Sequence, residues 1–155
     1  MKKRILIFLL LIILLTGCEK CKISKEKELY VNYIKELKEV NKSSNNIPFD
    51  IEIKYDKLTS NEVRYQVIID NVKENIYNIE ALTIHNKETQ DVFPSIGIFD
   101  DKEDLIVNKK PSGLILVGYI DYNGKLKDFK CINKVLIKYV TENKKMHKVY
   151  YVTKK

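Results

Sequence analysis

The sequence is poor in the residues from which many enzyme sites are built. Its 155 residues contain no tryptophan, only two histidines and only five glycines. With so few glycines it contains neither the G-x-x-x-x-G-K-[ST] loop that cradles phosphates nor the G-x-G-x-x-G fingerprint of dinucleotide sites. The G-x-S-x-G motif of serine hydrolases is also missing. We therefore expect no cofactor and no enzymatic activity.

The candidate metal and catalytic residues are too scattered to make a site. His85 and His147 stand beside predicted strand ends among polar neighbours, so we expect both to be exposed. Two histidines without a third clustered ligand do not form a catalytic zinc site. The acidic stretch 100–104 lacks the spacing of a calcium loop and indicates a solvated turn. We expect no metal, and a hydrolytic enzyme with an unrecognised site is kept as an alternative.

Arginine is as scarce as histidine. Arg4 and Arg64 are the only two among 28 basic residues, against 21 acidic ones. Arginine is the side chain that forms paired hydrogen bonds with guanine and phosphate, so we expect no nucleic-acid partner. The content of 45% hydrophobic and 32% charged residues is that of one soluble folded domain.

The N-terminus has the pattern of an export signal. A positive start at residues 1–4 precedes the uncharged apolar run Ile5–Leu15. As a helix this run would be about 16 Å long, roughly half the thickness of a bilayer core. It is therefore too short for an ordinary membrane span, and it is typical of a secretory signal peptide.

The end of that run resembles the lipobox of bacterial lipoproteins, because Leu15, Thr16 and Gly17 precede Cys18. The resemblance implies that signal peptidase II recognises Leu15, Thr16 and Gly17, that it cuts before Cys18, and that the Cys18 thiol carries a diacylglycerol group. The mature chain would then be anchored by lipid to the outer face of the cell membrane. The abundance of lysine, isoleucine and asparagine suggests a low-GC Gram-positive bacterium.

Export and the missing catalytic motifs together predict a binding role. We expect a non-catalytic interaction module at the cell envelope whose partner is an unknown protein or envelope ligand. An accessory or immunity-type lipoprotein, which would bind a toxin or a membrane complex, is the alternative.

Cys21 and Cys131 are the two cysteines left after lipidation. In an exported protein they can form a disulfide that closes a long loop. Alternatively, Cys131 is a buried strand cysteine and Cys21 a free thiol.

Three segments are expected along the chain. Residues 1–17 are the signal peptide, residues 18–46 form a lipid-anchored helical stalk and linker, and residues 47–155 form a β-sandwich. Within the stalk, apolar residues at spacings of three and four predict an amphipathic helix over 24–40. Interspersed acids favour docking on the domain, or a simple spacer, over binding to an anionic membrane.

Beyond residue 47 the apolar residues alternate with a period of two, which predicts short strands. The expected strands cover residues 51–55, 63–69, 76–84, 92–99, 105–107, 114–122, 132–140 and 146–152. The segment 114–122 is apolar on both faces, which predicts a central strand, and Asn123-Gly124 predicts a hairpin into 125–129. Pro94 suggests an edge position. The class expected is mainly β, an antiparallel sandwich with an immunoglobulin-like topology.

Tyrosines mark two candidate interaction surfaces, because exposed tyrosines are common at protein interfaces. One is the expected hairpin tip with Tyr119, Tyr122 and Asn123. The other is the adjacent pair Tyr150 and Tyr151, whose side chains must point to opposite faces of their strand. The alternative for this pair is that the helix covers its outer face through three apolar residues, which are Leu29, Tyr33 and Leu37.

Overall fold

The structure is a computed structural model that describes residues 25–89 and 91–155. The lipobox and Cys21 lie outside the described residues. The described helix comprises residues 25–39, and the strands that follow pair only in antiparallel fashion. The elements are β1 (Asp50–Thr59), β2 (Glu62–Asp70), β3 (Ile76–His85), β4 (Ser95–Ile96), β5 (Glu103–Leu105), β6 (Gly113–Asp121), η1 (Leu126–Asp128), β7 (Ile132–Thr141) and β8 (Met146–Lys154).

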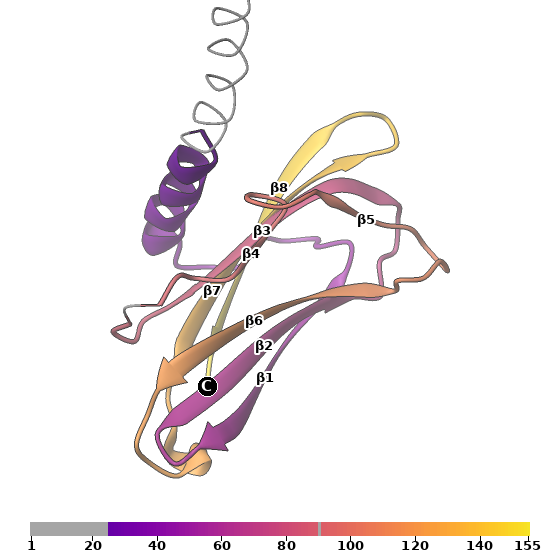
Figure 1. Ribbon diagram of the computed structural model, residues 1–155. Coiled ribbons are helices and arrows are strands. Elements are labelled where there is room, and N and C mark those ends of the chain that lie inside the picture. The colour runs from indigo at the N-terminus through magenta and orange to yellow at the C-terminus, as the bar shows by residue number, and fades with distance from the viewer. Residues whose placement is uncertain (1–24, 90) are drawn as a thin grey trace, which may run out of the picture.

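The strands form two sheets that pack face to face (Figure 1). One has the order β1-β2-β6 and is called the open sheet here. The other, the covered sheet, has the order β4-β3-β7-β8, with β5 also paired to β3. The predicted mainly β, two-layered antiparallel fold is thus confirmed. In immunoglobulin-like sandwiches strands A, B and E lie in one sheet and strands C, F and G in the other. Here β1, β2 and β6 have the order of A, B and E within one sheet, and β3, β7 and β8 have the order of C, F and G within the other.

The core between the sheets follows from the alternation of side chains along each strand. On β2 every second residue is buried, and on β7 the same holds for the face toward the open sheet. Those inward residues are Val63, Tyr65, Val67 and Ile69 on β2, and Val135, Ile137 and Tyr139 on β7.

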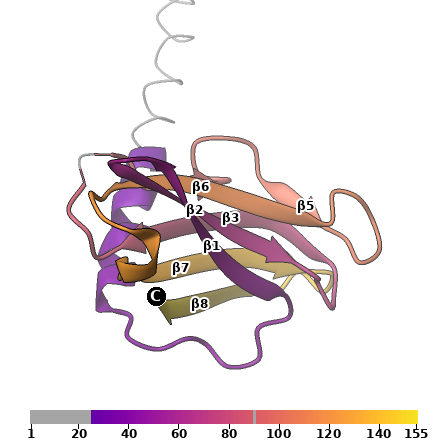
Figure 2. The same cartoon turned by 90° about the horizontal axis from the view of Figure 1, so that it is seen from below.

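The helix packs on the outer face of the covered sheet, which buries a second, smaller cluster (Figure 2). Tyr33 and Leu37 project from the helix onto Leu82 of β3 and Leu136 of β7. At the end of the helix the carbonyl oxygen of Lys38 lacks an intrahelical partner, and the Lys134 Nζ donates a hydrogen bond to it at 2.7 Å. The helix therefore docks on the sandwich.

Two expectations for the segment after residue 113 were wrong. β6 is an edge strand, because it pairs with β2 and with no other described strand. Residues after Asn123-Gly124 do not return as a hairpin partner but form the short turn η1 and cross to β7 in the other sheet. Local turn preference is outweighed here by the burial of Phe129 in the core.

The expected strand around Pro94 is reduced to the two residues of β4, and Pro94 precedes them at the edge of the covered sheet. Among the described residues, no helix is both long and apolar enough to cross a bilayer.

We predict that the docked helix contributes measurably to the stability of the domain. Leu37 is completely buried, so Leu37→Ala should lower the free energy of unfolding by about 2–5 kcal/mol. Val31 lies on the same helix with 46% of its surface exposed, and Val31→Ala should change the free energy by less than about 0.5 kcal/mol. Urea denaturation of both variants gives the two values, and equal losses would show that the helix does not dock.

Candidate interaction surface

The outer face of β6 presents a row of exposed apolar side chains. Ile115 is 54% exposed, Val117 37% and Tyr119 42%. Each alternates with a buried inward residue, and the inward position between Val117 and Tyr119 is Gly118. A Cβ atom at Gly118 would lie 2.4 Å from the hydroxyl oxygen of Tyr65, so only glycine fits against that ring. The strand is therefore well packed on one face and uncovered on the other.

The neighbouring strand β2 extends this row and gives it a polar border. Ile68 lies opposite Ile115 in the register and is half-buried. Arg64 lies opposite Tyr119, and its Nη2 is 3.0 Å from Asp56 Oδ2. The hydrogen bond from Arg64 Nε to Asp56 fixes the guanidinium group beside the tyrosine and raises the Arg64 pKa. An apolar centre with a polar rim is the usual anatomy of a protein interface.

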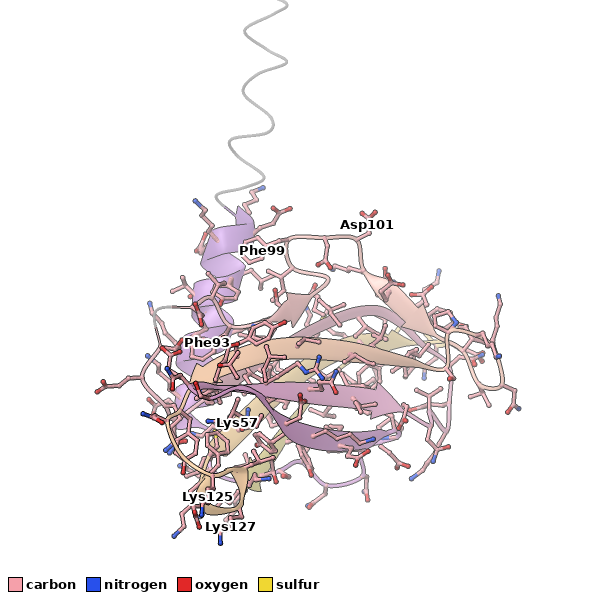
Figure 3. The ribbon with its side chains drawn as sticks, turned by 60° about the horizontal axis from the view of Figure 1, so that its bottom comes forward. Lys57, Phe93, Phe99, Asp101, Lys125 and Lys127 are labelled. Carbon is pink, nitrogen blue, oxygen red and sulfur yellow. The ribbon has the colours of Figure 1, made fainter. Side chains whose placement is uncertain are left out.

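Tyr122 and Asn123 follow directly after the end of β6. Asn123 is exposed, whereas the Tyr122 ring packs edge-on against Phe129 with centroids 5.0 Å apart. Lys57 Nζ lies 5.0 Å from the centre of the Tyr122 ring and donates a hydrogen bond to the Tyr122 carbonyl oxygen. Lys57, Lys125 and Lys127 gather at this end of the sandwich, away from Asp101 (Figure 3). The structure thus leaves Tyr119 and Asn123 exposed, whereas Tyr122 packs against the core between the sheets, so its place on the predicted surface is revised.

Tyr150 and Tyr151 do not lie on this surface, so that part of the prediction is revised. Tyr150 packs beneath the helix, and its hydroxyl donates a hydrogen bond to the Glu36 carboxylate. Tyr151 points the other way and packs against the core between the sheets. The alternative in which the helix covers Tyr150 is the one the structure has.

A strand edge offers unpaired backbone groups, and proteins usually cover or blunt such edges. The edge of β8 is covered by the segment between the helix and β1. Ser44 N–H donates to the Tyr150 carbonyl at 2.8 Å, and Ser44 Oγ accepts from Tyr150 N–H at 2.9 Å. Ser43 Oγ accepts from Val152 N–H at 2.9 Å. Two serines of the predicted linker therefore satisfy backbone groups of Tyr150 and Val152 on this edge.

The other edges are protected in different ways. β3 is covered by β4 and β5, which are too short to offer long edges themselves. β1 carries alternating charges on its outer face and shifts register between Lys57 and Thr59. β6 has neither device: no charged side chain occurs from Gly113 to Ile120, and within the described ranges no segment but β2 pairs with it.

A buried carboxylate forms the main polar cluster outside this surface. Glu80 projects from β3 toward the helix and has a side chain only 3% exposed. It accepts hydrogen bonds from the Tyr33 hydroxyl, from Lys102 Nζ and, at 3.1 Å, from Lys138 Nζ. Burial alone would raise the pKa of Glu80, but these three donors outweigh it and the pKa is lowered. Because the Tyr33 hydroxyl comes from the helix and Lys138 from β7, we assign the cluster to holding the helix in place.

His85 was expected to be exposed, and this was wrong. Its ring is buried between Tyr65 and Phe93, with centroids at 5.5 and 5.1 Å. Its Nδ1 accepts a hydrogen bond from Lys87 N–H, and burial lowers its pKa. The polar residues after His85 suggested that the strand ends at residue 84. In the structure β3 includes His85, so its ring is packed in the sandwich.

His147 is half-buried and stacks on Tyr139 with centroids 5.3 Å apart. Each histidine borders a surface hollow that also contains two carboxylates. The hollow at His85, of about 480 Å³, includes Glu88 and Asp91, and the one at His147, of about 650 Å³, includes Glu74 and Glu142. In the described part of the chain, no hydrogen bond links either histidine to a nucleophile or to these carboxylates. A nucleophile, base and orienting group are therefore not joined as catalysis by a triad requires.

Cys131 is buried and has no disulfide partner among the described residues, and its Sγ lies 3.2 Å from Asn133 Oδ1. Burial raises its pKa to about 11, which favours the protonated thiol over the thiolate at neutral pH. Because Cys21 lies outside the described residues, a disulfide between the two stays a prediction.

Two carboxylates of the acidic stretch accept hydrogen bonds from backbone N–H groups of other segments. Asp100 accepts a hydrogen bond from Gly97 N–H at 2.7 Å, and Asp104 accepts one from Asn78 N–H at 2.8 Å. Asn78 and Gly97 both have positive φ, so these carboxylates stabilise a bulged stretch of β3 and the turn after β4. Over residues 25–89 and 91–155, no three metal-ligating side chains come together.

Comparison of the chain with protein-family models, curated proteins and solved structures gives no match. The candidate surface therefore rests on the geometry of this chain. Sequence reasoning identified Tyr119, near the end of β6, but missed Ile115 and Val117. These two could have been found because residues 114–122 are apolar on both faces of the strand.

We predict that Glu80 makes the domain sensitive to acid. Because its pKa is lowered on folding, its ionised form stabilises the native state above the ordinary pKa of 4.5, and this contribution is lost as the pH falls through the folded pKa. Glu80→Gln should lower the free energy of unfolding by about 1–3 kcal/mol at pH 7 and flatten its decline in acid. Denaturation between pH 7 and 3 measures both effects.

The matched control is Glu103→Gln, which removes an exposed carboxylate on the adjacent strand β5. It should keep the acid sensitivity of the native protein. A Glu80→Gln variant with the same pH dependence as the native protein would contradict this role for the buried carboxylate.

Proposed function

We propose that this protein is a lipid-anchored lipoprotein on the outer face of the cell membrane, and that it acts as a non-catalytic binding module of the cell envelope. Its contact surface is the outer face and free edge of β6. The observation that carries this proposal is the row of exposed apolar side chains on an edge strand that has no protecting charge.

The chemistry of the surface favours a protein partner. Sites for small molecules are usually concave, whereas Ile115, Val117 and Tyr119 form a row along one strand with Arg64 at its border. A free strand edge also offers backbone donors and acceptors, which another strand can satisfy by β-augmentation. The alternative is an immunity-type or accessory lipoprotein whose partner is a toxin or a membrane complex.

The anchoring part of the proposal is supported by the lipobox residues Leu15 to Cys18. The described helix starts at residue 25, close in sequence to Cys18, and docks on the covered sheet. A lipid at Cys18 would therefore hold the domain near the bilayer through its helix and would leave the open sheet on the side away from the helix.

We predict that Cys18→Ala releases the protein from the membrane fraction or leaves it as an uncleaved precursor, because no thiol remains to receive the lipid. Cell fractionation and intact-mass measurement check this. Cys21→Ala is the control and should fractionate like the native protein. Unchanged mass and fractionation of Cys18→Ala would contradict the anchoring.

We predict that Val117→Lys weakens binding at the surface by at least about tenfold, because a lysine would have to be buried at the centre of the contact. The measurement is the amount of stoichiometric protein partner, including a differently tagged copy of this chain, that co-purifies from solubilised membranes. Leu58→Lys is the matched control, since Leu58 is 47% exposed on β1, at the other edge of the open sheet. Equal recovery with both variants would contradict the assignment of the surface to β6.

A further inference from the structure

We propose that the partner of β6 is β6 of a second copy of this chain, so that two open sheets join into one continuous antiparallel sheet of the order β1-β2-β6-β6-β2-β1. This inference rests on the proposed function and names the partner of the same surface. Its basis is the way the fold treats its strand edges.

The first argument is that β6 is the edge left without protection. On β8, Ser43 and Ser44 bind the backbone of Tyr150 and Val152. The edge of β3 is covered by β4 and β5. The edge of β1 is blunted by charged side chains and a register shift. An unprotected apolar edge aggregates with the strands of other chains unless a specific partner occupies it. Because each copy offers one such edge, two copies satisfy each other and the assembly closes at a dimer.

The second argument is that the sequence of β6 is self-complementary. A two-fold axis through Val117 aligns all nine residues of the strand with the second copy. Val117 then lies opposite Val117 of the second copy, and Ile115 lies opposite its Tyr119. Pairs of β-branched residues and of an aromatic with a β-branched residue are favourable across strands.

The third argument is electrostatic. In this register Asp121, the charged residue that ends the strand, lies opposite Gly113 of the second copy. No two like charges therefore face each other along the seam, an arrangement that would be destabilising. The face of β1 with Asp50, Glu52 and Lys54 offers no comparable apolar row.

The fourth argument comes from the order of the layers. The helix, the covered sheet and the open sheet are stacked in that order, because the helix packs on the face of the covered sheet away from the open sheet. A two-fold axis perpendicular to the joined sheet keeps both helices on the same side of the dimer. Two copies anchored near their helices can therefore pair on one membrane, where tethering also raises their effective concentration.

Thiol cross-linking of the full chain in native membranes tests the pairing. Val117→Cys is made in a Cys21→Ser background, so that the Cys21 thiol cannot react. A bismaleimide is then added, in which each maleimide double bond takes up one thiol and no oxidant is needed. We expect most of the Val117→Cys chain to appear at twice the monomer mass, because the two sulfur atoms face each other.

The register supplies a matched control. In the proposed pairing Ile115 lies four residues from its own counterpart along the strand, a separation of about 13 Å. With a bismaleimide shorter than this distance, Ile115→Cys should give at least tenfold less dimer than Val117→Cys. Ile115 lies opposite Tyr119 of the second copy, so co-expression of Ile115→Cys with a tagged Tyr119→Cys chain should restore the cross-link as a mixed dimer. This mixed dimer also tests the pairing if Val117→Cys fails to fold.

Equal cross-linking of Val117→Cys and Ile115→Cys would indicate random collision and would overturn the pairing. Absence of both the Val117→Cys dimer and the mixed dimer would overturn it as well. If a different protein still co-purifies and is lost with Val117→Lys, the binding function stands while the self-pairing fails. If Cys18→Ala leaves the fractionation unchanged, the envelope function fails whatever the cross-links show.

Discussion

The arrangement of this protein depends on the burial of both faces of the covered sheet. One face packs on the open sheet, and the other packs on the helix through Tyr33 and Leu37. The one α-helix among the described residues packs on the covered sheet, and the outer face of the open sheet keeps exposed side chains on β6. Glu80 reinforces this asymmetry, because its hydrogen bonds with Tyr33 and Lys138 connect the helix to the covered sheet. The exposure of β6 is thus a consequence of where the helix docks.

Several features of the fold were predictable because they depend on neighbouring residues. The period-two pattern of β2 corresponds directly to the alternation of buried and exposed side chains in the structure. The helix was predictable from its apolar spacing, and Pro94 indicated an edge. The features that failed depend on contacts distant in sequence. Asn123-Gly124 favours a tight turn locally, but Phe129 is buried against the core and draws the chain across to β7.

The candidate surface was half predictable for the same reason. Tyr119, Tyr122 and Asn123 stood out by residue type, whereas Ile115 and Val117 look like the residues of any buried strand. A strand that is apolar on both faces is normally covered on both faces, and the sequence does not say what covers it. Tyr150 shows the opposite case, because a tyrosine with an outward position is covered by the helix and bonded to Glu36. Residue type identifies side chains that are common at protein interfaces, but only the tertiary arrangement shows which of them stay exposed.

The treatment of strand edges connects the fold to the proposed function. Free strand edges in proteins are usually covered or blunted. In this protein Ser43 and Ser44 bind the edge of β8, and two short strands cover the edge of β3. The β6 edge has eight residues without a charge before Asp121, so it needs a partner to pair with its free backbone groups. A second copy meets this requirement without any further component, since it brings the same apolar row in the opposite direction. The layer order then places both helices on one side, which is the geometry that attachment to a single membrane requires.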